Sequence, residues 1–152
     1  MSTDKTKVVG SVLVELVDSN GEVKDRRQVN NLVVDAGLDL IADRMLGAET
    51  GDAMTHMAVG TGGTAPAAGD TTLGTEPATG RVTLDSSTVA SNVLTYTATF
   101  PAGTPSGASN ALQEAGIFSA SSGGTMLCRA TYSVINKGSS DSLVITWTVT
   151  IS

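Results

Sequence analysis

The sequence predicts a mainly β protein: an antiparallel β-sandwich of jelly-roll or immunoglobulin-like type, with an N-terminal hairpin and one short α-helix. Three features lead to this prediction. They are an Asn20-Gly21 turn between two β-forming runs, strict apolar alternation near the C-terminus, and a single stretch with helical spacing. A length of 152 residues fits one domain, so we expect a loose tail over residues 1–6 and a single sandwich domain over residues 7–152.

The N-terminal hairpin is predicted from residues 8–17 and 23–29. Val12, Val14 and Leu16 alternate along the first run and mark its buried face. Between the runs, Asn-Gly provides the two residues that most readily adopt positive φ in a tight hairpin turn. The chain therefore opens with two antiparallel strands.

One helix is expected after this hairpin, from Asp35 as its N-cap to a stop at Gly47. An apolar stripe follows the spacing i, i+3, i+4 and i+7: Leu38, Ile41, Ala42 and Met45. This stripe predicts the buried face of the helix.

The rest of the chain reads as strands separated by Gly-, Ser- and Pro-rich turns. The expected strands cover residues 54–59, 81–90, 93–100, 114–119, 126–135 and 143–151. A long loop should cover residues 60–70. Threonines occupy the outward positions of residues 93–100 and 143–151, which suits a sheet face that is either solvated or in contact with a partner through many modest interactions.

Residues that could support catalysis or bind a cofactor are few, and we expect no enzyme activity, metal or cofactor. His56 is the single histidine and Cys128 the single cysteine, so a metal site lacks ligands and a nucleophile–base pair would need two distant residues to meet. The run from Gly60 to Thr64 lacks the Lys and the following helix of a phosphate loop. Glu114 opens an apolar strand, and we expect a structural ion pair with Arg81 or Arg129.

The charge balance argues against nucleic-acid binding. The net charge is -6, and the one locally basic stretch, residues 24–27, also contains an Asp. The N-terminus lacks the apolar region of a signal peptide, and no stretch is long enough to span a membrane, so synthesis and folding in a cytoplasm are expected.

Several phrases together resemble small virion structural proteins of tailed bacteriophages and prophages. They are residues 31–44 (NLVVDAGLDLIADR), 54–66 (MTHMAVGTGGTAP), 69–73 (GDTTL), 114–118 (EAGIF), 124–129 (GTMLCR) and 136–138 (NKG). The resemblance covers most of residues 30–152 and implies a virion component made in the host bacterial cytoplasm. It carries over no catalytic residue.

Within that resemblance, the first hypothesis is a head decoration or cement protein. It would assemble with itself, as a trimer, and with the major capsid protein, using the N-terminal tail and hairpin or residues 60–76 as contact arms. The alternative is a tail, baseplate or fibre-adaptor protein. A carbohydrate-binding module is a third hypothesis, but the alternation directs Trp147, Tyr96 and Phe100 inward, away from a sugar.

Overall fold

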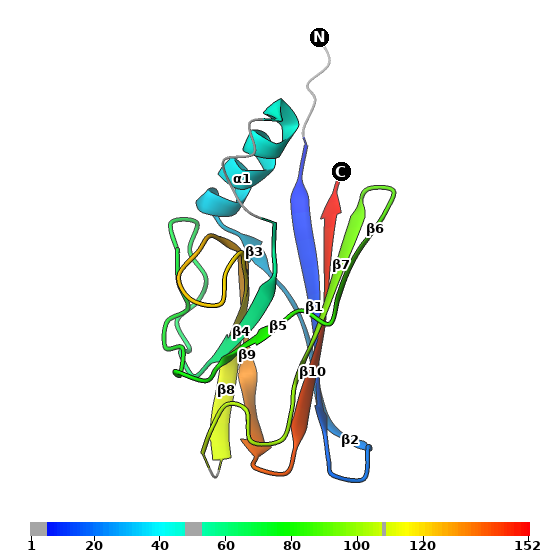
Figure 1. The fold of residues 1–152 in the computed structure, drawn as a ribbon, viewed down its shortest axis with the longest axis vertical. Helices are drawn as coiled ribbons and strands as arrows, with labels where there is room; N and C mark the ends of the chain where they lie inside the picture. Colours follow the sequence, from blue (N-terminus) through cyan, green and yellow to red (C-terminus); the bar gives the residue numbers. More distant parts are fainter. Residues whose placement is uncertain (1–5, 48–52, 108) are drawn as a thin grey trace.

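A computed structural model describes residues 6–47, 53–107 and 109–152, and it is a β-sandwich of two antiparallel five-stranded sheets with a single short helix (Figure 1). Most of the expected tail, residues 1–5, lies outside the described residues.

Sheet A has the strand order β2-β1-β10-β7-β6. Its strands are β1 (Val8–Val17), β2 (Val23–Asn30), β6 (Ser86–Ala90), β7 (Val93–Phe100) and β10 (Ser142–Ile151). The predicted hairpin is confirmed as β1 and β2. Its turn differs from the expected one, because Gly21 has a φ of 84° whereas Asn20 does not have positive φ, and the turn is closed by hydrogen bonds between Asp18 and residues 21 and 22. β10 lies in the middle of the sheet and pairs with β1 from Val8↔Ile151 to Val17↔Ser142.

Sheet B has the order β3-β9-β8-β4-β5. Its strands are β3 (Leu32–Val33), β4 (His56–Gly60), β5 (Arg81–Thr83), β8 (Ser109–Phe118) and β9 (Met126–Gly138). The sequence places one strand over residues 81–90, and this is wrong. The chain pairs with sheet B as β5, crosses at Leu84 and Asp85, and continues in sheet A as β6.

The main core lies between the two sheets. The alternating residues of β1, β7 and β10 point into it, and the largest fully buried side chains include Trp147 and Phe100. Trp147, Tyr96 and Phe100 are therefore buried, as their alternation predicts. Aromatic rings are few in this chain, at 3% of its residues, and most of the core is aliphatic.

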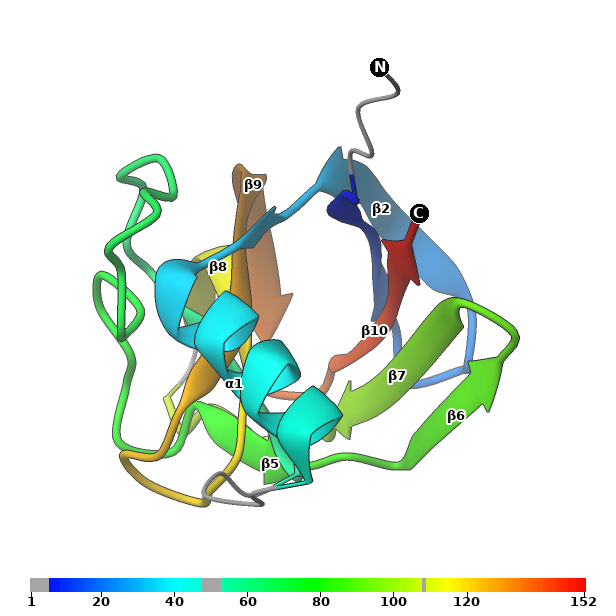
Figure 2. The ribbon, with the colours of Figure 1, turned by 90° about the horizontal axis from the view of Figure 1, so that it is seen from above.

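Helix α1 (Asp35–Leu46) lies over one end of the sandwich (Figure 2). Gly47 ends it in the left-handed conformation, as predicted, but Val34 rather than Asp35 occupies the N-cap position. The predicted apolar stripe is also wrong, because Leu38 and Met45 are 43% and 85% exposed.

The buried face of α1 is instead centred on Gly37 and Leu40. A Cβ at Gly37 would lie 2.1 Å from the carbonyl oxygen of Leu127 on β9. The missing side chain therefore lets the helix backbone rest directly on the strand, which turns the predicted stripe away from the core.

Candidate functional site

The long segment between β4 and β5, residues 61–80, packs against the outer face of sheet B (Figure 2). A second, smaller hydrophobic cluster lies beneath it, made by Val34, Ala58, Leu73, Phe118 and Met126. This segment, which we call the covering loop, is the candidate contact arm that the sequence proposes over residues 60–76. Its described residues belong to the fold rather than extending from it.

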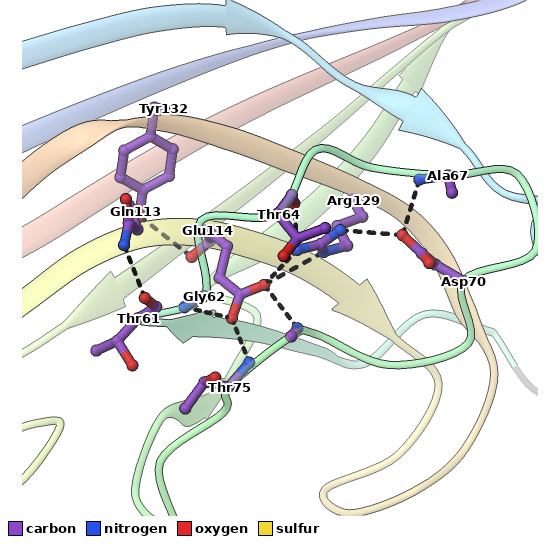
Figure 3. Close-up of polar contacts among 11 residues, drawn as sticks. Thr61, Gly62, Thr64, Ala67, Asp70, Thr75, Gln113, Glu114, Arg129 and Tyr132 are labelled. Carbon is purple, nitrogen blue, oxygen red and sulfur yellow. Dashed lines mark hydrogen bonds and ion pairs between the residues drawn. The ribbon is translucent and has the colours of Figure 1, made fainter.

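The side chain of Glu114 on β8 binds the backbone of the covering loop (Figure 3). Its side chain is fully buried. Oε1 accepts hydrogen bonds from the backbone N–H groups of Gly62 and Thr75, at 2.9 and 2.7 Å, and Oε2 accepts one from Gly74 at 2.8 Å. A carboxylate that accepts several backbone N–H bonds is stabilised in its charged form, which offsets the cost of burial.

Arg129 on β9 is the ion-pair partner of Glu114, one of the two partners that the sequence proposes. Its Nη2 and Nε lie 2.8 and 3.2 Å from Oε2 of Glu114. Nη1 donates to Asp70 at 2.9 Å, and Nη2 also donates to the carbonyl oxygen of Thr64 at 2.9 Å. One buried guanidinium thus connects two strands of sheet B to two points on the loop.

Glycines make this close approach possible. A Cβ at Gly60 would lie 2.4 Å from Oε1 of Glu114 and 2.4 Å from the carbonyl oxygen of Thr75, and one at Gly62 would lie 2.6 Å from the same Oε1. The Gly-rich run therefore binds a carboxylate of its own chain, and its geometry explains the glycines without a phosphate ligand.

Arg81 on β5 anchors the end of the covering loop. Its Nε and Nη2 each donate to a different oxygen of Glu76 at 2.8 Å, and Nη1 donates to the carbonyl oxygens of Ala120 and Gly123. The guanidinium carbon lies 3.8 Å from the centre of the Phe118 ring. This is a bidentate, stacked arginine site, in which Lys could not replace Arg.

His56 and Cys128 have separate surroundings. The Nδ1 atom of His56 lies 2.7 Å from the hydroxyl of Thr55, and Cys128 is fully buried in the main core. Burial raises the pKa of the Cys128 thiol, which disfavours the nucleophilic thiolate. Among the residues that the structure describes, no three His, Cys, Asp or Glu side chains come together as metal ligands.

Lys24, on the basic stretch of residues 24–27, is paired within the molecule. Its Nζ lies 2.8 Å from Asp141, whose carboxylate also accepts the backbone N–H of Gly138. The hydrogen bond from Lys24 lowers the pKa of Asp141. On the neighbouring β9, the buried Lys137 donates to the carbonyl oxygen of Pro101, and desolvation lowers its pKa.

The outer face of sheet A is a second candidate surface. Cross-strand neighbours form hydroxyl rows across it: Ser86, Thr97 and Thr146 in one row, and Thr88, Thr95, Thr148 and Ser11 in the next. Charged groups lie at its margin. Glu15 pairs with Arg26 at 2.8 Å, and Asp85 accepts a hydrogen bond from Thr99. A broad uncharged strip therefore crosses a chain whose net charge is -6.

An apolar pocket of about 400 Å³ lies between α1 and the inner face of sheet A. Leu40 and Ile41 line it from the helix, and Leu94, Tyr96 and Val149 line it from the sheet. Burial raises the pKa of Tyr96 to about 12, because desolvation disfavours the phenolate.

Sequence reasoning finds Glu114 and one of its proposed partners, but it misses the backbone contacts of the carboxylate. The available signal was the glycine pattern at positions 60, 62 and 74 together with one buried-strand glutamate. Asp70 and Glu76, which complete the two arginine networks, carry no distinguishing sequence pattern.

Comparison of the chain with models of protein families gave no match, and neither did comparison with curated protein sequences or with solved structures. In the described part of the chain, no helix has the length and apolar character needed to cross a bilayer.

Proposed function

We propose that this chain is a non-enzymatic structural protein of a tailed-bacteriophage virion, and that it acts as a head decoration protein. It would bind the outer surface of the capsid, as an oligomer and in contact with the major capsid protein, and stabilise the shell. The observation that carries the proposal is the uncharged strip of hydroxyl side chains across the outer face of sheet A.

That face is unlike the usual surface of a small soluble domain, in which charges of both signs are interspersed. Thr95, Thr97, Thr146 and Thr148 are half-buried by one another and expose short hydroxyl side chains. Short, stiff side chains lose little conformational entropy when a partner covers them. Such a face favours contact with another protein surface over the binding of a charged ligand.

The phrases that carry the resemblance to virion proteins also support a structural role. Gly62, Asp70, Glu114 and Arg129 all fall within them, and all four take part in the network beneath the covering loop. These four residues thus fix the covering loop to sheet B and stiffen the scaffold. A rigid scaffold suits a protein whose role is to add buried interface between neighbouring shell subunits.

The number of copies per particle, measured by quantitative mass spectrometry of purified virions, tests this proposal. A copy number in the hundreds, in fixed ratio to the major capsid protein, is expected. About six, twelve or eighteen copies would instead place the protein in the symmetric rings of a tail, baseplate or fibre adaptor. Absence from virions would contradict both locations.

A matched pair of variants links the result to the uncharged face. Thr148→Glu puts a charge in the middle of that face, whereas Thr83→Glu puts the same charge on the exposed Thr83 of β5 in sheet B. Purified protein added to capsids that lack it should bind as wild type for Thr83→Glu and lose binding for Thr148→Glu. Equal binding by the two variants would contradict the role of this face.

A further inference from the structure

Strand β6 forms an open edge of sheet A. In the described chain it pairs with β7, from Ser86↔Thr97 to Ala90↔Val93, and all five of its residues are exposed. The strand reads Ser-Ser-Thr-Val-Ala, without charge, proline or glycine. An edge strand of this kind leaves alternate backbone N–H and C=O groups ready to pair with another strand.

The other three terminal strands of the two sheets are charged or short. β2, at the opposite edge of sheet A, carries Lys24, Asp25, Arg26 and Arg27 and has a register shift where β1 reaches Leu16 and Val17. At the edges of sheet B, β3 has two residues and β5 has three. Charges, irregularities and short strands are the usual means of preventing edge-to-edge pairing. β6 has no charged residue and no register shift, and with five residues it is longer than β3 or β5.

We infer that β6 pairs antiparallel with β6 of a second copy of this chain, forming a two-fold dimer. This inference goes beyond the proposed function and does not rest on it. Pairing centred on Thr88 places Ser87 opposite the partner's Val89, and no charge faces a like charge in this register. The two sheets A would continue into one another, and a two-fold contact closes on itself rather than extending into a fibre.

The apolar surface beside β6 favours the same contact. Val89 is 69% exposed although it lies across from Leu94 on the inward side of β7. A pocket of about 210 Å³ opens beneath it, lined by Val89, Leu94, Tyr96 and Met54. A second β6 would bring its own Val89 and Ser87 to the same inward side, and would cover apolar area that the single chain leaves in water.

The absence of charge on β6 makes this edge suitable for pairing with a second copy of the chain. With a net charge of -6, two copies repel each other over most of their surfaces. The uncharged β6 edge is a place where two copies can approach with backbone hydrogen bonds and without that repulsion. Because five residues bury a small area, the dimer should be weak and dependent on concentration.

Sedimentation equilibrium of the full chain, from about 1 μM to about 500 μM, tests the inference over the range in which small interfaces dissociate. The mass should rise from 15.3 kDa to twice that value. Thr88→Lys and Thr88→Glu should each raise the dimer Kd about tenfold or more, because like charges would face each other across the new strand pair. An equimolar mixture of the two variants should restore the dimer.

Thr95→Lys provides the matched control, since Thr95 lies beside Thr88 on the outer face but on an interior strand. It should leave the dimer unchanged. A monomer at every concentration, a trimer, no rescue in the mixture, or loss of the dimer in Thr95→Lys would each overturn β6 pairing. Should Thr88→Lys unfold, Thr88→Arg and Thr88→Asp would be compared in the same way, because position 88 is the one that faces itself across the two-fold axis. The virion proposal is tested separately by copy number, so the two can fail independently.

Discussion

Arg129 approaches Glu114 with two nitrogens on one oxygen: Nε at 3.2 Å and Nη2 at 2.8 Å from Oε2. The other oxygen, Oε1, is left to the backbone of the covering loop. The side chains of Arg129 and Glu114 are 3% and 0% exposed. A buried pair of this kind contributes stability mainly because each partner would be costly to bury alone.

Glu114→Gln should therefore lower the free energy of unfolding by about 3 kcal/mol or more, because it removes the charge that balances buried Arg129. Urea unfolding followed by circular dichroism measures this. Glu15→Gln is the matched control at the exposed pair with Arg26, and should cost less than about 1 kcal/mol. Equal losses in the two variants would contradict the structural role of Glu114.

Gly62→Ala should cost about 1–3 kcal/mol, because the added Cβ overlaps Oε1 of Glu114 and the backbone of the covering loop. The loop should also become more susceptible to limited proteolysis. Gly69, in the same loop, has open space where its Cβ would be, so Gly69→Ala should change stability by no more than about 0.5 kcal/mol. A loss of stability in Gly69→Ala as large as that in Gly62→Ala would contradict this prediction.

Gly37→Ala should destabilise the protein although Ala is the better helix former. Propensity by itself would add about 1 kcal/mol of stability, whereas the clash with the Leu127 carbonyl oxygen forces α1 away from β9. The sign of the change in unfolding free energy decides between the two effects. The reverse exchange at exposed Ala42, Ala42→Gly, measures propensity without a clash on the same helix.

Asp141 should make stability depend on pH in acid. Because Lys24 holds the pKa of Asp141 below its usual 3.8, the folded state binds this proton less readily than the unfolded chain does. The contribution is therefore fully present above the unfolded pKa and is lost as the pH falls through the folded pKa. Asp141→Asn should be less stable than wild type at neutral pH and should lose less stability on acidification, as measured by urea unfolding at a series of pH values. An unchanged pH dependence would contradict the prediction.

Cys128 should be inert in the folded protein. Its thiol is fully buried and its pKa is raised, so a disulfide reagent at about pH 8 should react with it in urea and not in native buffer. The urea sample serves as the control for reagent and thiol content. Rapid reaction in native buffer would contradict the buried position.

The sequence was most informative where local chemistry decides the structure. The Asn20-Gly21 signal located the first hairpin, in which Gly21 takes the positive φ, and the alternation of β10 determines which side chains face the core. The buried face of α1 could not be predicted, because it depends on Gly37 meeting a strand that lies about 90 residues later in the sequence. Similarly, no local signal marks the crossing at Leu84 and Asp85, since both of the strands it joins have the same β-forming composition.

For the candidate site, composition predicted that Glu114 is paired, but not which arginine pairs with it. Arg81 and Arg129 are equivalent in sequence terms, and the choice is made by the β8–β9 register, which sets Glu114 opposite Thr131, two residues along β9 from Arg129. Such pairing between strands is a tertiary property, and periodicity cannot supply it.

The position of β10 has a consequence for how the protein folds during synthesis. β10 follows every other strand in the sequence, yet it lies between β1 and β7. Before β10 is synthesised, the hairpins β1–β2 and β6–β7 lack the strand that joins them in sheet A. Pairing of β1 with β10 joins residues as far apart as Val8 and Ile151. Closing so long a loop costs conformational entropy, so we expect this strand pair to form last. Sheet A should therefore be completed only once β10 has been synthesised and is free to pair, in a single cooperative event.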